Sequence, residues 1–154
     1  MSDGSKKLGI TGLGGIVKTQ VALKLAYRMR DEDAECSLFR IPCTSLEVVE
    51  QACTAIAQMV GIQNVKLEGT KHCIKAHFSE MDGKWLLIYD NADDIDMWNK
   101  SNGTILPLKD FLPYNDQGRI IFTIRNRRLA IQLAHSDGGT ETQPKSFGFC
   151  QRRL

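Results

Sequence analysis

The most informative segment of the sequence is Gly12-Leu13-Gly14-Gly15-Ile16-Val17-Lys18-Thr19. A short apolar run, residues 8–11, precedes it, and residues 18–29 follow with apolar side chains at helical spacing. A glycine-rich turn that joins a strand to a helix and ends in Lys-Thr matches the phosphate-binding pattern G-x-x-x-x-G-K-S/T. In that pattern, successive main-chain amides surround phosphate oxygens at the N-terminus of a helix. We therefore predict phosphate contacts for five residues of the stretch: Gly12, Gly14, Gly15, Lys18 and Thr19.

Val17 departs from this pattern, because it stands where the pattern has its second glycine. A β-branched residue resists positive φ, and its methyl groups occupy space through which the main chain would approach a phosphate. A loss of about 1.4 kcal/mol would already weaken binding tenfold. We therefore expect phosphate binding to be weakened or lost relative to a loop with glycine at this position.

Asp90 ends a second informative stretch, the continuous apolar run Trp85-Leu86-Leu87-Ile88-Tyr89. A run without alternation is what a parallel strand covered on both faces requires. Such a strand delivers the aspartate to its carboxyl end, where ligands of open α/β sheets bind. Together with the Lys-Thr loop, this predicts that Thr19 and Asp90 hold Mg²⁺ beside the phosphates. Asn91 follows where many P-loop ATPases have a second acid, and asparagine cannot accept a proton, so we expect slow hydrolysis at most.

Arg125 stands directly after a further apolar run, residues 119–124. A guanidinium at the end of a strand can bind phosphate oxygens through two hydrogen bonds. A surface arginine that merely follows a strand fits the same position. Because the glycine loop and Asp90 precede it in the chain, we favour a role for Arg125 in sensing a terminal phosphate.

The rest of the chain alternates strand and helix patterns. Residues 37–41 and 119–124 form strand patterns, and Thr44-Ser45-Leu46-Glu47 has the spacing of a capping box before a helix that ends at Gly61. Residues 71–81 and 127–134 form further helix patterns. This alternation predicts an α/β fold, a P-loop NTPase-like three-layer sandwich with a mostly parallel and incomplete sheet. We expect a flexible N-terminus over residues 1–7, a nucleotide-binding domain over 8–134 and a polar, disordered segment over 135–154.

Composition and charge exclude several classes of protein. The 154 residues are 42% apolar and 25% charged, as in globular proteins. No apolar run has the length of a membrane span and no secretory signal is present, so we expect a cytoplasmic protein without membrane contact. The five cysteines include no C-x-x-C pair, which argues against a zinc site or a disulfide framework. The net charge is +2, and the basic residues from Arg119 onward have no aromatic interleaving, so no nucleic-acid partner is expected.

Some conspicuous residues have plainer explanations. Asp93, Asp94 and Asp96 fit capping of the following turn better than metal binding. Trp85 and Trp98 fit packing in a core.

Taken together, the motifs resemble the NB-ARC domain of STAND-class P-loop NTPases, in the form of fungal NLR-like proteins. The likeness covers residues 8–134 and rests on three phrases: Gly12-Leu-Gly-Gly-Ile-Val-Lys-Thr-Gln-Val-Ala-Leu-Lys-Leu-Ala-Tyr27, Trp85-Leu-Leu-Ile-Tyr-Asp-Asn-Ala-Asp-Asp94 and Gly118-Arg-Ile-Ile-Phe-Thr-Ile-Arg-Asn-Arg127. The resemblance implies a signalling switch that holds ADP when off and exchanges it for ATP to self-associate or engage protein partners. Such switches act in innate immunity, self/non-self recognition and cell death. It further implies that residues 12–19 cradle phosphates, that Asp90 serves Mg²⁺ and that Arg125 senses the γ-phosphate.

Members of that family continue into a fifth strand, a small helical subdomain and a winged-helix subdomain. The chain therefore looks truncated relative to the family. If the family's strand order holds, the strand before the glycine loop is expected to lie at an unprotected edge of the sheet.

Two other functions stay open. A degenerate module that acts only through protein contacts would need neither a nucleotide nor Lys18. A dinucleotide-dependent oxidoreductase is suggested by residues 12–17, which nearly match G-x-G-x-x-G, and by the acids within residues 31–35. Lys18, Thr19 and Asp90 argue against it, because dinucleotide folds need none of them.

Overall fold

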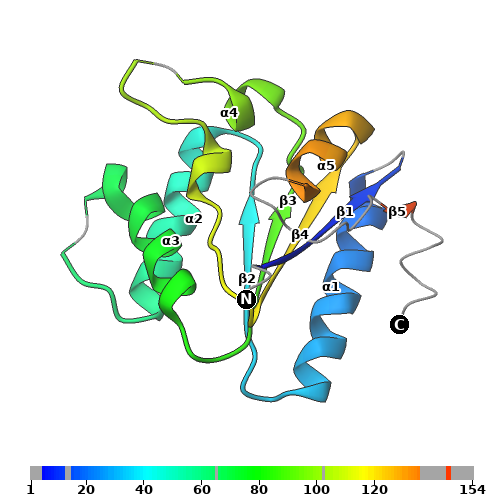
Figure 1. The fold of residues 1–154 in the computed structure, drawn as a ribbon, viewed down its shortest axis with the longest axis horizontal. Coiled ribbons are helices and arrows are strands. Elements are labelled where there is room, and N and C mark those ends of the chain that lie inside the picture. The colour runs from blue at the N-terminus through cyan, green and yellow to red at the C-terminus, as the bar shows by residue number, and fades with distance from the viewer. Residues whose placement is uncertain (1–4, 13–14, 65, 102, 136–144, 147–154) are drawn as a thin grey trace.

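The computed structural model describes residues 5–12, 15–64, 66–101, 103–135 and 145–146 (Figure 1). Strands and helices alternate along these residues, as the sequence predicts. In chain order the elements are β1 (Lys6–Thr11), α1 (Gly15–Glu32), β2 (Ser37–Pro42), α2 (Leu46–Met59), the 3₁₀ helix η1 (Leu67–Gly69), α3 (Thr70–Glu80), β3 (Trp85–Asp90), α4 (Ile95–Asn99), the 3₁₀ helix η2 (Leu108–Phe111), β4 (Gly118–Ile124), α5 (Arg127–Ala134) and β5 (Lys145–Ser146).

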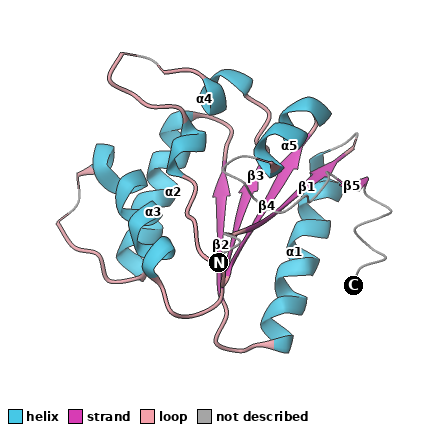
Figure 2. Ribbon diagram, viewed as in Figure 1, coloured by secondary structure: helices cyan, strands magenta, loops and turns pink. Residues whose placement is uncertain are grey.

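The strands form one parallel sheet, whose order within the described residues is β2-β3-β4-β1-β5 (Figure 2). Because all of these strands run in the same direction, their carboxyl ends lie at one edge of the sheet. Each residue that follows a strand therefore starts from that edge, which is where ligands of open α/β sheets bind.

Helices cover both faces of the sheet and give the molecule three layers (Figure 1). On one face α1 packs against β1, β3 and β4, and on the other face α2, α3 and α5 pack around a larger cluster. Strand β3 lies between these layers and is buried at every position, because its alternate residues face opposite helices. The predicted α/β fold class, a three-layer P-loop NTPase-like architecture, is confirmed.

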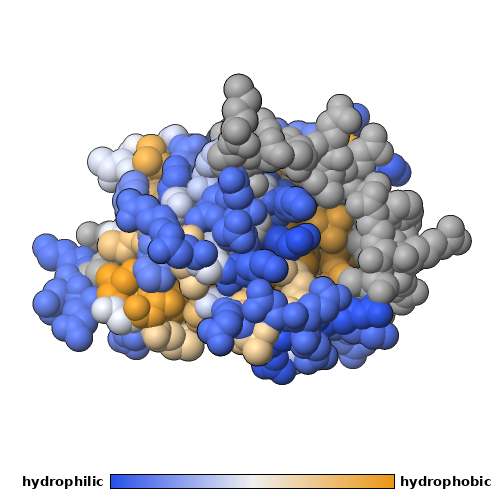
Figure 3. All heavy atoms as spheres, turned by 60° about the horizontal axis from the view of Figure 1, so that its bottom comes forward, coloured by the Kyte–Doolittle hydropathy of each residue, from blue (hydrophilic) through white to orange (hydrophobic). Residues whose placement is uncertain are grey.

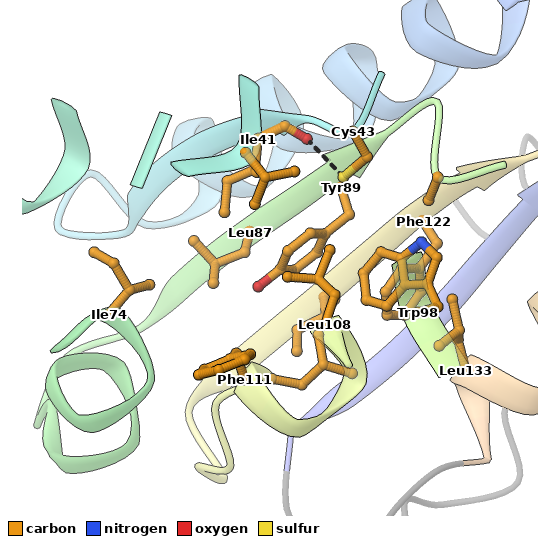
Figure 4. Close-up of a cluster of buried hydrophobic side chains, with 14 of the residues drawn as sticks. Ile41, Cys43, Ile74, Leu87, Tyr89, Trp98, Leu108, Phe111, Phe122 and Leu133 are labelled. Atoms are coloured by element: carbon orange, nitrogen blue, oxygen red, sulfur yellow. Dashed lines mark hydrogen bonds between the residues drawn. The ribbon is translucent and has the colours of Figure 1, made fainter. Parts of the chain in front are cut away.

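The larger cluster contains several aromatic side chains that contact one another (Figure 4). Tyr89, Trp98 and Phe122 meet with ring centroids 5.4–5.6 Å apart. Trp85 is also fully buried. A Cβ at Gly118, the first residue of β4, would lie 1.9 Å from the Trp85 ring, so the close approach of β4 to this ring requires glycine. The predicted packing role of both tryptophans is confirmed.

The first strand begins earlier than predicted. β1 starts at Lys6, and Ser5 before it is 1% exposed. The Ser5 hydroxyl donates to the main-chain oxygen of Pro113 at 3.0 Å and accepts from the main-chain nitrogen of Asn115 at 2.9 Å. These bonds order residues that the sequence analysis assigned to a flexible N-terminus; residues 1–4 lie outside the described residues.

The cap of α2 also differs from the prediction by one residue. The helix begins at Leu46, and Ser45 rather than Thr44 is the N-cap, with extended backbone angles. The Ser45 side chain accepts a hydrogen bond from the main-chain nitrogen of Val48 at 3.2 Å. Glu47 consequently lies in the first turn, one position too early for a reciprocal capping box.

β5 lies beside β1, with Lys145 opposite Ile10 and Ser146 opposite Thr11. The expectation that β1 is an unprotected edge is therefore wrong at these two positions, because main-chain pairing covers them. The rest of the segment predicted to be disordered, residues 136–144 and 147–154, lies outside the described residues.

The surface is mainly polar on the face shown in Figure 3, with a few hydrophobic areas between hydrophilic ones. Scattered apolar side chains are normal on a protein surface and by themselves indicate no function. Within the described part of the chain, no helix combines the length and apolar character that crossing a membrane requires.

Candidate functional site

The candidate site lies at the carboxyl edge of the sheet. The register places Thr11 opposite Ile124, so Gly12 and Arg125 leave adjacent strands beside each other. Asp90 ends β3, on the other side of β4. The sheet thus brings all three predicted parts of the site to one edge.

The glycine-loop half of the site joins β1 to α1. Gly12 has a φ of +154°, a conformation that favours glycine. Lys18 is 2% exposed, and its Nζ donates to the main-chain oxygen of Gly12 at 2.8 Å. Gly15 is the first residue of α1, whereas Gly14 lies outside the described residues. A buried ammonium group beside the N-terminus of a long helix creates a positive environment suited to an anion.

Val17 lies within α1 and is not among the residues with positive φ. The expectation that Val17 strains the backbone is therefore wrong: the helix has already begun at Gly15, and valine adopts helical backbone angles without positive φ. The Val17 side chain is 47% exposed. Any effect of Val17 on phosphate binding would come from the space that its methyl groups occupy.

Asp90 is fully buried and accepts hydrogen bonds from two threonines. Thr19 Oγ1 donates to Asp90 Oδ1 at 2.8 Å, although 71 positions separate the two residues in the sequence. Thr123 Oγ1 donates to the same oxygen at 2.5 Å and accepts from the main-chain nitrogen of Asn91 at 2.8 Å. The Thr19–Asp90 bond links the helix of the glycine loop directly to the end of β3.

Arg40 of β2 completes this cluster, and the sequence analysis gave it no role. Its Nε donates to Asp90 Oδ2 at 3.0 Å, and its Nη2 donates to the same oxygen. Burial raises the pKa of Asp90, but the hydrogen bonds from Thr123, Arg40 and Thr19 outweigh burial and hold the pKa below its ordinary value of 3.8. Asp90 is therefore a carboxylate at neutral pH.

Strand alternation is the signal that points to Arg40 and Thr123. Residues two apart in a strand share a face. Leu38 and Ile121 pack in the layer of α1, so the same face of the sheet carries Arg40 and Thr123 at its carboxyl edge. Asp90 lies on that face as well, because it follows Leu86 and Ile88 of the same layer.

The cluster fits a Mg²⁺ site only in part. The predicted pair, Thr19 and Asp90, comes within hydrogen-bonding distance. A carboxylate has about two acceptor positions on each oxygen, and here Oδ1 accepts from two threonines while Oδ2 accepts two donors from Arg40. Mg²⁺ needs oxygen ligands with available lone pairs, directly or through water. In this arrangement the Asp90 carboxylate does not fit a metal ligand.

The remaining predicted residues lie at the same edge. Arg125 is exposed, and its main-chain nitrogen donates to Asp93 Oδ1 at 2.5 Å. Asp94 caps α4 by accepting from the main-chain nitrogens of Asp96 and Met97 at 3.0 and 3.2 Å, which confirms its predicted capping role. A phosphate-sensing role for the Arg125 side chain stays a prediction.

Comparison with known proteins identifies one informative sequence relative. No family model matches the sequence. A protein of Hyaloscypha variabilis, described as a nucleotide-binding leucine-rich repeat (NLR)-like protein, is 36% identical over 141 residues. The match covers 86% of this chain but only 14% of the relative. The chain is thus similar to one segment of a much longer NLR-like protein.

Solved structures share the fold at low sequence identity. The Aeropyrum pernix ORC1 protein, solved in complex with DNA, superposes with a TM-score of 0.58 and 17% identity over 93% of this chain and 39% of its own. Drosophila ORC bound to DNA gives a TM-score of 0.45 at 10% identity, over 94% of this chain and 26% of its own, which is too low to support an argument. The first likeness supports the fold alone, and DNA is a ligand of those proteins.

Proposed function

We propose that this chain is an adenine-nucleotide-binding module of the NB-ARC type in a signalling protein, with slow hydrolysis or none. The observation that carries the proposal is the Thr19–Asp90 hydrogen bond, which joins the glycine loop and the end of β3 into one site. ADP or ATP would place its phosphates at the N-terminus of α1, beside the buried Lys18. Arg125, which follows the neighbouring strand, would meet a terminal phosphate.

The comparisons support the coarser part of this proposal, a nucleotide-binding signalling module. The name of the NLR-like relative includes nucleotide binding, and this chain matches one segment of it. The shared fold with ORC1 agrees with a P-loop architecture. The NB-ARC assignment, the choice of ADP over other nucleotides, self-association and a cytoplasmic location remain predictions from the sequence.

Slow hydrolysis follows from the residue after Asp90. Asn91 has a left-handed φ of 57° and donates its main-chain N–H to Thr123. Its amide side chain cannot accept a proton from an attacking water, and Asp90 itself is engaged by three side chains. Neither residue is therefore suited to act as a general base.

The strand order argues against a dinucleotide-dependent oxidoreductase. In dinucleotide-binding folds, with the order 3-2-1-4-5-6, the strand before the glycine loop lies beside the second strand. Here β1 lies between β4 and β5, and β3 and β4 separate it from β2. A protein-interaction module without nucleotide binding is the alternative that experiment must exclude.

Calorimetry with ADP on matched variants tests the proposal. Lys24 is exposed on the same helix as Lys18, so Lys24→Ala removes the same side chain away from the loop. We expect the unchanged chain and Lys24→Ala to bind ADP with micromolar or weaker affinity. Lys18→Ala should bind about ten- to a hundredfold more weakly, because hydrogen bonds to charged groups contribute about 1.5–3 kcal/mol.

The contrary outcomes point to different conclusions. Equal binding by the unchanged chain and Lys18→Ala would contradict a phosphate site in the glycine loop. Absence of ADP binding in all three proteins would favour the interaction module, and preference for NAD over ADP would revive the dinucleotide alternative.

A further inference from the structure

Arg40 is a feature of the site that nucleotide binding by itself does not explain. Among the described residues, β2 is an edge strand of the sheet, and its last residue, Pro42, lies opposite Asp90 in the register with β3. Arg40 nevertheless directs two donors to Asp90 Oδ2 while 45% of its side chain remains exposed. A cation thus lies against the acid of the site and is open to solvent.

The guanidinium of Arg40 engages Oδ2, one of the two oxygens through which Asp90 would hold a metal. Oδ1 of Asp90 accepts from Thr19 and Thr123, and Oδ2 accepts from Arg40, so the acceptor capacity of the carboxylate is used. The positive charge of the guanidinium also balances the negative charge that would attract a divalent ion. Binding of Mg²⁺ through Asp90 would require that Arg40 first move away.

We propose that Arg40 takes the charge-balancing place of a divalent cation, so that the site binds a nucleoside diphosphate or triphosphate free of metal. This inference rests on the proposed function and specifies the form of its ligand. A guanidinium is permanently charged, and it carries more N–H donors than its contacts with Asp90 use. Because its guanidinium contacts Asp90, Arg40 is a positioning residue: it acts on the ligand by balancing the charge of Asp90 and keeping this carboxylate from a metal.

ADP calorimetry in excess Mg²⁺ and again in excess EDTA tests the inference on four proteins. The first is the unchanged chain, and the others are Arg40→Gln, Arg40→Lys and a control, Arg28→Gln, whose arginine is exposed on α1. The dissociation constant of the unchanged chain and of Arg28→Gln should change by less than about twofold between the two conditions. Arg40→Gln frees Asp90 for a metal, so Mg²⁺ should tighten its ADP binding about tenfold. Arg40→Lys keeps a cation and should resemble the unchanged chain.

The outcomes separate this inference from the proposed function. ADP binding by the unchanged chain that depends on Mg²⁺ as strongly as binding by Arg40→Gln would overturn the role of Arg40 and leave the nucleotide site intact. No ADP binding by any protein in either condition would overturn both. Urea unfolding shows whether each variant folds. If Arg40→Gln does not fold, the unchanged chain still provides the test, because ADP binding that requires Mg²⁺ in this protein would overturn the inference.

Discussion

The two halves of the candidate site differ in their contacts: side chains of other elements hold Asp90 at the end of β3, whereas the glycine-loop half is built on the N-terminus of a helix. On the β3 side, the buried carboxylate of Asp90 is surrounded by donors from three other elements, among them Thr123 and Arg40. On the glycine-loop side, the site consists of the N-terminus of α1, the folded-back Lys18 and the half-exposed Val17. Both carboxylate oxygens of Asp90 are engaged by side chains of the protein itself, whereas on the glycine-loop side we expect the N-terminus of α1 and the Lys18 ammonium group to contribute to anion binding. We therefore expect ligand binding to depend mainly on the glycine loop. The arrangement of the elements around the site should depend mainly on the contacts of Asp90.

The largest expected effect is a difference in thiol reactivity between the two halves. Cys43 is 1% exposed, its main-chain nitrogen donates to the Asp90 main-chain oxygen at 2.7 Å, and burial raises the pKa of its thiol well above 9.0. A cysteine introduced by Val17→Cys would lie half-exposed at a helix N-terminus, where thiolates are favoured. Iodoacetamide should label it at least about 100-fold faster than Cys43, because reactivity follows the thiolate fraction and access.

Mass spectrometry of peptides from the native protein measures both rates in one sample. Cys53, whose pKa burial raises to about 12, serves as an internal control for a closed core. Similar rates at Cys43 and at the introduced cysteine would show that the Asp90 half opens as readily as the loop.

The next effect concerns stability. Thr123→Val keeps the shape of the side chain but removes the donor to Asp90 and the acceptor for Asn91. The unfolding free energy should fall by about 1–3 kcal/mol, since buried polar groups lose their partners. Thr54→Val is a matched control, because the Thr54 hydroxyl donates only to the main-chain oxygen of Glu50 in its own helix.

Urea unfolding of both variants gives the comparison. Thr54→Val should cost less than about 0.5 kcal/mol, because back-bonding within a helix contributes little. If Thr123→Val were no more destabilising than Thr54→Val, the account of Asp90 as a structural cluster would be wrong.

The smallest expected effect is on the loop half, where Val17 can be shortened in two steps. Val17→Ala removes two methyl groups and keeps a good helix former, whereas Val17→Gly also frees the backbone. If space alone limits phosphate approach, both variants should bind ADP more tightly, by up to about tenfold or 1.4 kcal/mol. Tighter binding by Val17→Gly alone, measured by calorimetry, would instead indicate a backbone constraint that the helical position of Val17 does not suggest.

The fold was largely predictable, because its signals are local. Strands buried on both faces leave continuous apolar runs, as in β3. The predicted helices of the described residues were all found, with shifted ends except for α5, whose bounds match the prediction. The shifts came from contacts that local patterns do not contain. Ser5 is ordered by bonds to a loop 108 positions away, and the choice of Ser45 over Thr44 as the cap depends on where the backbone turns helical.

The site residues were predictable only where they belong to motifs whose order along the chain is characteristic. Thr19 and Asp90 were paired from the order of two motifs, and the structure brings them together. Arg40 and Thr123 were missed because alternation within a strand indicates only which residues share a face, whereas their contacts with Asp90 also depend on which strands are neighbours and in which register. The error at Val17 has a similar origin, since a sequence pattern does not state at which residue the helix begins.

A ¹⁵N–¹H chemical-shift titration with ADP would show where on the chain the nucleotide binds. The account predicts that the largest shifts belong to the main-chain amides of residues 12–19, with smaller changes at Asn91 and Arg125, and that Lys18→Ala suppresses them. A cavity of about 420 Å³ at the C-terminal end of α2, lined by residues that include Thr54, Gly61 and Thr70, offers a different place for a small molecule. Shifts confined to that cavity, or none at the glycine loop, would contradict the account.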